Sequence, residues 1–253
     1  MSALKTRREG PVWIVTIDRP EVKNAIDAAT AHEINAAMDT LDGDDTLFLG
    51  IITGAGGVFS AGADLKAAAR GEAPARSKRG PFGLCENPPG KPLIAAVEGI
   101  AYGGGFEICL ACDLIVAAQD ARFALPEVKH NLVALGGGAI RLPRRLPYHV
   151  AMEAALTGAP MGTEELRSYG VVNRLAVPGE ALTAARALAD ELLCNGPTAL
   201  AATARVMRAS NAAHEEELWR TQRELASQAL HAEDRAEALR AFAEKRKPEW
   251  KGR

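Results

Sequence analysis

The sequence predicts an α/β protein in which a mixed core of strands and helices is followed by a helical C-terminal third. A first segment, residues 12–18, alternates and is rich in β-branched side chains, as expected of a strand. Two apolar segments, 47–53 and 93–98, begin 46 positions apart, and each runs into a glycine-rich turn and a helix start. This spacing indicates a repeated strand–turn–helix unit. Helical periodicity dominates after residue 150.

The elements of the first half follow in order from these patterns. After the strand at 12–18 and a turn through Pro20, Asp27 is placed to cap a helix that ends near Gly43. The strand at 47–53 leads into GAGG and FSAGADL, and the strand at 93–98 leads into AYGGGFE and another apolar helix. A further strand is expected at residues 114–118.

A long segment between these two units, Arg70 to Pro89, combines proline, glycine and charge without periodicity. Such a composition is typical of a long loop and is poorly suited to a packed element. Because its flanks lead to the two glycine-rich turns, we expect this loop to become ordered when a ligand binds.

Helical patterns dominate the remainder of the chain. A third glycine cluster, residues 136–138, precedes them, and one strand is expected at 171–177. The predicted helices are 150–156, 164–169, 181–193, 198–208, 215–231 and 236–246.

The composition excludes several classes of function. The 253 residues include 32 acidic and 30 basic side chains, and the net charge of -2 provides no broad field for nucleic acid or an anionic membrane surface. The basic N-terminal residues are not followed by an apolar stretch of signal-peptide type, and we therefore expect a cytoplasmic protein. A chain of this length buries a full core without disulfides.

Four cysteines are too few for a disulfide framework in a chain of this length. Cys109 and Cys112 form a CxxC motif, but two further ligands at comparable spacing, which a structural zinc requires, are missing. Both lie in the apolar stretch EICLACDLIV, where cysteine behaves as a small buried hydrophobic residue. We expect reduced thiols and no metal.

Familiar catalytic motifs do not account for the glycine-rich turns. Residues 54–59 do not follow the G-x-G-x-x-G pattern, and GK[ST] of the P-loop does not occur. Ser60 lies in GVFSAG, which lacks the G-x-S-x-G elbow of serine hydrolases. The segment HEEEL at 214–218 lacks the second histidine of a zinc protease and is interpreted as a solvated helix face.

Four residues remain as candidates for chemistry. Ala63 and Gly104 each stand at the opening of a helix after a strand, where backbone N–H groups are unsatisfied and two of them can form an oxyanion hole. Glu107 follows Gly104 by one helical turn, and Glu127 follows Pro126. The alternative reading is a pair of tight turns and two helix-terminal acids. Taken together, two donors and two carboxylates suit chemistry through an enolate.

Three segments, FSAGADL, AYGGGFEICLACDL and FALPEVK, resemble the enoyl-CoA hydratase/isomerase (crotonase) superfamily. The resemblance extends from RPEVKNA at 19–25 to FAEKRKPEW at 242–250. It implies a spiral of β-β-α repeats over residues 1–195 and a helical region over 196–253 that forms a homotrimer or a dimer of trimers.

The resemblance also implies roles for individual residues. Ala63 and Gly104 would hold the thioester carbonyl, Glu107 would activate water and Glu127 would protonate the α-carbon. The reaction would be reversible hydration of a 2-enoyl-CoA, a lyase reaction typical of fatty acid metabolism. It would need no cofactor, because coenzyme A belongs to the substrate. The positions that correspond to the family's substrate-binding segments are Lys23, Ala25, Ala61, Asp64, Leu65 and Lys245.

One position departs from the superfamily pattern. Hydratases commonly carry proline and glycine where this chain has Ala134 and Leu135, immediately before the glycine cluster. We expect Leu135 to bring bulk close to the acyl and water site, which puts hydration of crotonyl-CoA in doubt and favours a specialised acyl group or dehydration of a hydroxyacyl-CoA. The alternatives are an enoyl-CoA isomerase and a non-catalytic CoA- or RNA-binding member, for which the only support is a small basic cluster, Arg141, Arg144 and Arg145.

Overall fold

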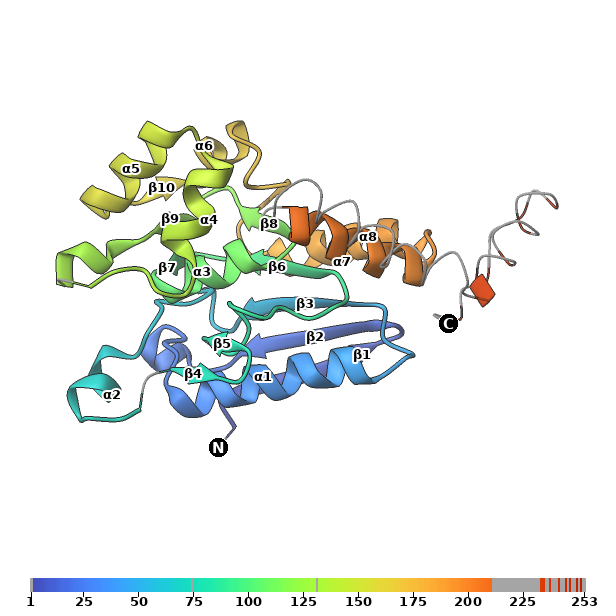
Figure 1. Cartoon of the computed structure of the whole chain (residues 1–253), viewed down its shortest axis with the longest axis horizontal. Coiled ribbons are helices and arrows are strands. Elements are labelled where there is room, and N and C mark those ends of the chain that lie inside the picture. Colours follow the sequence, from blue (N-terminus) through green and yellow to red (C-terminus); the bar gives the residue numbers. More distant parts are fainter. Residues whose placement is uncertain are drawn as a thin grey trace.

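The structure is a computed structural model, and it describes three long stretches, residues 2–73, 75–130 and 132–210 (Figure 1). In the C-terminal segment it describes isolated positions: 233, 234, 237, 241, 244, 246, 249 and 251. The predicted helix at 215–231 and the candidate Lys245 therefore lie outside the described residues. The predicted helix at 236–246 is described only at positions 237, 241, 244 and 246, of which the first three are helical.

A six-stranded sheet in the order β1-β2-β3-β6-β8-β11 forms the centre of the molecule. The β1–β2 pair is antiparallel, and every other neighbouring pair is parallel. The strands are β1 (Leu4–Glu9), β2 (Val12–Ile17), β3 (Leu49–Gly54), β6 (Leu93–Val97), β8 (Leu114–Ala118) and β11 (Arg174–Ala176).

A second sheet makes the chain a spiral. It contains β10 (Met161–Gly162), β9 (Arg122–Ala124) and β7 (Ile100–Tyr102), and an isolated bridge from Ser60 to Ala101 extends it. Each coil places one strand in the central sheet and the next in the second sheet, as in β6–β7 and β8–β9. The predicted spiral of β-β-α repeats is confirmed.

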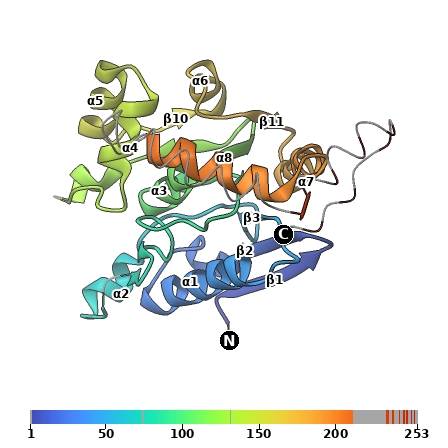
Figure 2. The same ribbon diagram turned by 45° about the vertical axis from the view of Figure 1, so that its right-hand side comes forward.

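Helices complete the coils and cover both sides of the sheet (Figures 1 and 2). The first α-helix, α1, is capped by Asp27, whose carboxylate accepts a hydrogen bond from the N–H of Thr30. The α-helices are α1 (Ala28–Gly43), α2 (Leu65–Ala69), α3 (Gly104–Ala111), α4 (Gly138–Arg145), α5 (Tyr148–Thr157), α6 (Thr163–Ser168), α7 (Ala181–Leu193) and α8 (Pro197–Ser210), and the 3-10 helices are η1 (Pro20–Val22) and η2 (Pro126–His130).

Strand alternation divides the interior into two apolar clusters. Ile14, Ile51 and Ile94 point to one side of the central sheet, where α7 covers them. Val15 and Ile52 point to the other side and pack with α1, α3 and the second sheet. Because successive side chains of a strand face opposite ways, a central strand between two layers is apolar throughout.

Residues 70–89 differ from the expected loop. They contain a short hairpin of β4 (Arg76–Ser77) and β5 (Gly80–Pro81), and the Leu84 and Cys85 side chains are buried. Gly83 has φ of +84°, and a Cβ atom there would lie 2.4 Å from a carbonyl oxygen of α1. The prediction of no packed element was wrong, because a few apolar residues anchor a segment whose average composition is polar.

The C-terminal part of the described chain begins with α8, which Arg208 joins to the core. The guanidinium of Arg208 donates to the carboxylate of Asp113, which follows α3, and to the carbonyl oxygens of Pro89 and Lys91. Across the described residues, no helix combines the length and apolar character that crossing a membrane requires.

Candidate active site

Two glycine-rich turns meet beside the second sheet. The N–H of Tyr102 donates to the carbonyl of Ser60 at 2.9 Å, which aligns the two chain segments. A Cβ atom at Gly62 would lie 2.9 Å from the backbone nitrogen of Gly104 and 2.6 Å from the carbonyl oxygen of Tyr102. The turns therefore approach this closely because residue 62 has no side chain, and its φ of +91° also favours glycine.

The N–H groups of Ala63 and Gly104 lie on these two turns. Among the hydrogen bonds of the described residues, none uses either N–H as a donor. Gly104 is the first residue of α3, where the unsatisfied N–H groups and the helix dipole both favour negative charge. The structure thus brings the two predicted donors to neighbouring turns and leaves both available to an acceptor.

Glu107 lies one turn into α3 and is only 1% exposed. Its Oε1 accepts a hydrogen bond of 2.8 Å from the N–H of Gly138, and a Cβ atom at Gly136 would lie 2.6 Å from its Oε2. Burial, opposed by the Gly138 N–H and assisted by the charge of Glu127, raises the pKa of Glu107 to about 7. Near neutral pH this carboxyl can therefore both take up and release a proton.

Glu127 approaches the same place from η2. A Cβ atom at Gly103, which precedes the first residue of α3, would lie 3.1 Å from Oε1 of Glu127. Its effect on the pKa of Glu107 also places the two carboxyls within electrostatic reach of each other. The predicted acid pair is thus brought together around the start of α3, next to the N–H of Gly104.

The glycine turn at 136–138, which contacts Glu107, is held by Arg141 of α4. One guanidinium nitrogen donates to the carbonyl oxygen of Gly136 at 3.1 Å, and another donates to that of Cys85 at 2.5 Å. The side chain therefore joins the turn to the end of the 70–89 segment. Its positive charge also opposes the rise in the pKa of Glu107.

The two predicted coenzyme A segments run side by side. The N–H of Ala61 donates to the carbonyl of Lys23, and a bridge joins Ile26 to Ala63. The Lys23 side chain is exposed and Leu65 is 48% exposed, whereas Ala25 is buried. These segments form an edge next to the N–H of Ala63.

Asp64 lies within this edge, but its carboxylate has structural partners. Oδ1 accepts a hydrogen bond from the N–H of Ala67, and Oδ2 pairs with Arg19 at 3.1 Å. The Ala67 N–H is the main cause that lowers the pKa of Asp64. Asp64 thus fixes the start of α2 beside the predicted donor at Ala63.

Leu135 lies immediately before the glycine turn, and its side chain is 81% exposed in the described chain. The residue that lies against this turn is Phe82, for which the sequence patterns gave no prediction. A Cβ atom at Gly104 would lie 2.4 Å from its ring, and one at Gly136 would lie 3.0 Å from it. The only signal in the sequence is an aromatic residue between two glycines, GPFG, inside a polar segment.

The remaining predictions concern the cysteines and a metal site. Cys85, Cys109 and Cys112 are buried free thiols, and burial raises the pKa of each. Within the described part of the chain, no cluster of three or more His, Cys, Asp or Glu side chains could hold a metal ion.

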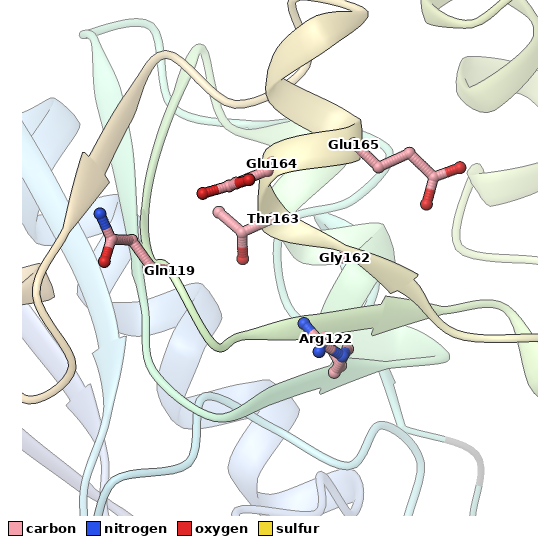
Figure 3. A pocket seen from close by; sticks show the side chains of 6 residues that line it. All are labelled: Gln119, Arg122, Gly162, Thr163, Glu164 and Glu165. Carbon is pink, nitrogen blue, oxygen red and sulfur yellow. The ribbon is translucent and has the colours of Figure 1, made fainter.

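A surface pocket of about 390 Å³ is shown in Figure 3. It contains none of the predicted site residues, and its threonine hydroxyl already donates to the carbonyl oxygens of Ala118 and Ala121. The pocket therefore lies apart from the candidate site, and its hydroxyl group is already engaged by the backbone. Its lining residues are Gln119, Arg122, Gly162, Thr163, Glu164 and Glu165.

Comparisons with known proteins place this geometry in context. A family model described as enoyl-CoA hydratase/isomerase matches residues 7–253. A carnitinyl-CoA dehydratase of Salmonella paratyphi B is 45% identical over 260 residues, with 99% of each chain covered. Among solved structures, an enoyl-CoA hydratase from Mycobacterium tuberculosis H37Rv is 47% identical with a TM-score of 0.96, and a carnitinyl-CoA hydratase from Mycobacterium avium is 40% identical with a TM-score of 0.81. Both structural matches cover 100% of each chain.

Proposed function

The chain belongs to the enoyl-CoA hydratase/isomerase family, and from this premise we propose that it catalyses reversible hydration of a 2-enoyl-CoA thioester. Membership makes it an enzyme of the crotonase type, and its relatives include hydratases and dehydratases of CoA thioesters. The observation that carries the proposal is the meeting of two available N–H groups with two carboxyls at the start of α3.

In the hydration direction, Glu107 takes a proton from water, and the oxygen of that water forms a bond to the β-carbon. The electron pair of the carbon–carbon double bond moves into the thioester, and the resulting enolate oxygen is held by the N–H groups of Ala63 and Gly104. Glu127 then gives its proton to the α-carbon, which completes the addition. Dehydration is the same sequence in reverse.

The pKa of about 7 suits Glu107 for this exchange, because a general base is most effective when its pKa lies near the operating pH. A neutral carboxylic acid is also less costly to bury than a carboxylate, which explains why an acid can remain in this apolar setting. The Gly138 hydrogen bond holds Oε1, so that Oε2 is the oxygen oriented by the turn at Gly136.

The direct test uses purified protein, crotonyl-CoA and water labelled with heavy oxygen. We expect loss of the conjugated thioester absorbance and one labelled hydroxyl at the β-carbon. Incorporation of solvent hydrogen without labelled oxygen would instead identify an isomerase. No hydration of crotonyl-CoA and no dehydration of carnitinyl-CoA, the thioester in the name of the Salmonella relative, would contradict the proposal for either acyl group.

The same proposal includes the binding of coenzyme A along residues 23–25 and 61–65, with Lys245 as a phosphate contact from a neighbouring subunit in a homotrimer or dimer of trimers. We also propose a cytoplasmic enzyme that needs no metal or separate cofactor. Sedimentation of the full chain tests the assembly. Activity that survives exhaustive dialysis against a chelator tests the absence of a metal requirement.

A further inference from the structure

The ring of Phe82 lies between the two parts of the candidate site. It faces Gly104, whose N–H is a proposed donor, and Gly136, whose turn contacts Glu107. A Cβ atom at Gly136 would lie 3.0 Å from the ring and 2.6 Å from Oε2 of Glu107, so the ring and this carboxyl oxygen are neighbours. Both glycines leave room that the ring occupies.

The backbone around Phe82 is built to present this ring. Phe82 has φ of +54°, a conformation that residues with a side chain rarely adopt. Its N–H donates to the carbonyl of Ala75 at 2.8 Å, and Gly83 packs tightly against α1 beside Ile34. A strained residue persists where its surroundings fix it, and such residues cluster at functional sites.

We propose that Phe82 is a specificity-determining residue whose ring closes the acyl side of the site and limits the bulk that an acyl group can carry beside Gly104 and Glu107. The inference rests on the proposed function, because the acyl carbons must lie between the donor at Gly104 and the acid at Glu107. An enolate formed there brings its β-carbon and its substituent toward the ring. Removing the ring enlarges that space.

The ring has a second consequence for Glu107. The titratable and charged groups facing this carboxyl are Glu127 of η2, Arg141 of α4 and Cys85 after the hairpin. None of them changes when Phe82 is replaced. Water admitted by loss of the ring would lower the pKa of Glu107 from about 7 toward its ordinary value.

The test compares binding of acetyl-, butyryl-, hexanoyl- and decanoyl-CoA to the wild type, Phe82→Ala and Phe82→Gly by calorimetry. These saturated thioesters bind without reacting, so the measurement does not depend on turnover. We expect both variants to favour the longer acyl groups over acetyl-CoA by roughly tenfold or more relative to the wild type. Phe82→Gly is decisive if the alanine variant is unstable, because glycine adopts this φ without strain.

Two controls accompany the binding series. Phe48→Ala removes a half-buried ring immediately before β3, and it should leave the acyl preference unchanged. Carbon NMR of labelled carboxyls, with the Glu107 signal assigned from Glu107→Gln, should show a lower pKa in the Phe82 variants but not in Phe48→Ala. A merely structural role of Phe82 would not move this titration.

The outcomes separate the two proposals. Folded Phe82→Ala and Phe82→Gly variants with the wild-type acyl preference would overturn the role of Phe82. A wild type that binds acyl-CoA but hydrates no enoyl-CoA would overturn the proposed function, but it would not affect the conclusion that Phe82 limits the size of the acyl group. A wild type that binds no acyl-CoA would overturn both.

Discussion

The segment at the start of α2 and the segment at the start of α3 each carry one proposed donor and one acid, but their surroundings differ. Ala63 and Leu65 are exposed, and Asp64 between them is tied to Arg19 and to the start of α2. At the start of α3, every residue from Gly104 to Glu107 is buried. The buried segment fixes the proposed proton-transfer acid, whereas the exposed segment leaves one side of the candidate site open to a large ligand.

Replacing the acids of the buried side should have the largest effect. We expect Glu107→Gln and Glu127→Gln each to lower turnover by about 10²- to 10⁴-fold, because each removes a proton-transfer group. Affinity for a saturated acyl-CoA should change little, since the proposed donors to the thioester are backbone groups. Steady-state kinetics and calorimetry measure the two quantities.

Asp64→Asn is the corresponding acid-to-amide change in the exposed segment at the start of α2. It should leave turnover within about tenfold of the wild type, a much smaller loss than removal of a proton-transfer group causes. Wild-type hydration by either glutamine variant would remove that glutamate from the mechanism.

Glu107 and Asp64 should also make the free energy of unfolding depend on pH in opposite directions. Folding raises the pKa of Glu107 from 4.5 to about 7, so the folded chain keeps a proton that the unfolded chain releases in this interval. The free energy of unfolding should therefore fall as pH rises from 4.5 to about 7, by on the order of 3 kcal/mol at most. Glu107→Gln should abolish this fall in urea titrations.

Folding lowers the pKa of Asp64, so its contribution is present above the unfolded pKa of 3.8 and is lost as pH decreases below it. Asp64→Asn should remove that acid-side loss and leave the interval above pH 4.5 unchanged. If the free energy of unfolding fell equally with pH in Glu107→Gln and in the wild type, burial would not be what shifts the pKa of Glu107.

The close approach of the two turns should depend on Gly62 more than on other glycines. Gly62→Ala places Cβ 2.6 Å from a carbonyl oxygen at φ of +91°, whereas Gly71→Ala at φ of +78° meets nothing within 4 Å. We expect about 1 kcal/mol of destabilisation for Gly71→Ala from backbone strain alone, and about 1–3 kcal/mol more for Gly62→Ala. Chemical denaturation tests the difference, and equal losses would refute the steric account.

Leu135→Gly should produce the smallest effect. With 81% of its side chain exposed, Leu135 has little bulk to remove from the buried acyl side. We expect the ratio of kcat/KM for crotonyl-CoA to that for longer enoyl-CoAs to change by less than in Phe82→Ala. An increase of about 1–3 kcal/mol in discrimination in favour of crotonyl-CoA would instead support the expectation that the Leu135 side chain adds bulk beside the acyl group.

The sequence predicts the central strands and the long helices well, because strong periodicity and an N-cap such as Asp27 mark them. The strand at 171–177 shrinks to β11, and the sequence patterns do not indicate β1, β7, β9 and β10. β7, β9 and β10 have only two or three residues, which carry too little alternation to detect, and pairing with distant segments fixes them. β1 has six residues, but most of them are charged and exposed, so it shows no apolar alternation.

Three of the candidates, Ala63, Gly104 and Glu107, were accessible from the sequence because they follow recognisable strand–turn–helix junctions, and Glu127 was accessible because it follows Pro126. Their neighbours were not. Phe82 lies in a segment whose proline, glycine and charge conceal one aromatic side chain. Its place follows from the packing of the next residue, Gly83, against α1 and from the room that two glycines, Gly104 and Gly136, leave for the ring. Local composition does not encode such contacts.

The hairpin segment at 70–89 is a separable part for engineering. It carries neither proposed donor and neither proposed acid, yet it contributes the ring beside them. Its ends are joined to α2 on one side and, through Lys91, to the carbonyl oxygens of Leu41 and Asp44 on the other. Exchanging this one segment between related chains is therefore a route to new acyl-group selectivity that leaves the proton-transfer groups in place.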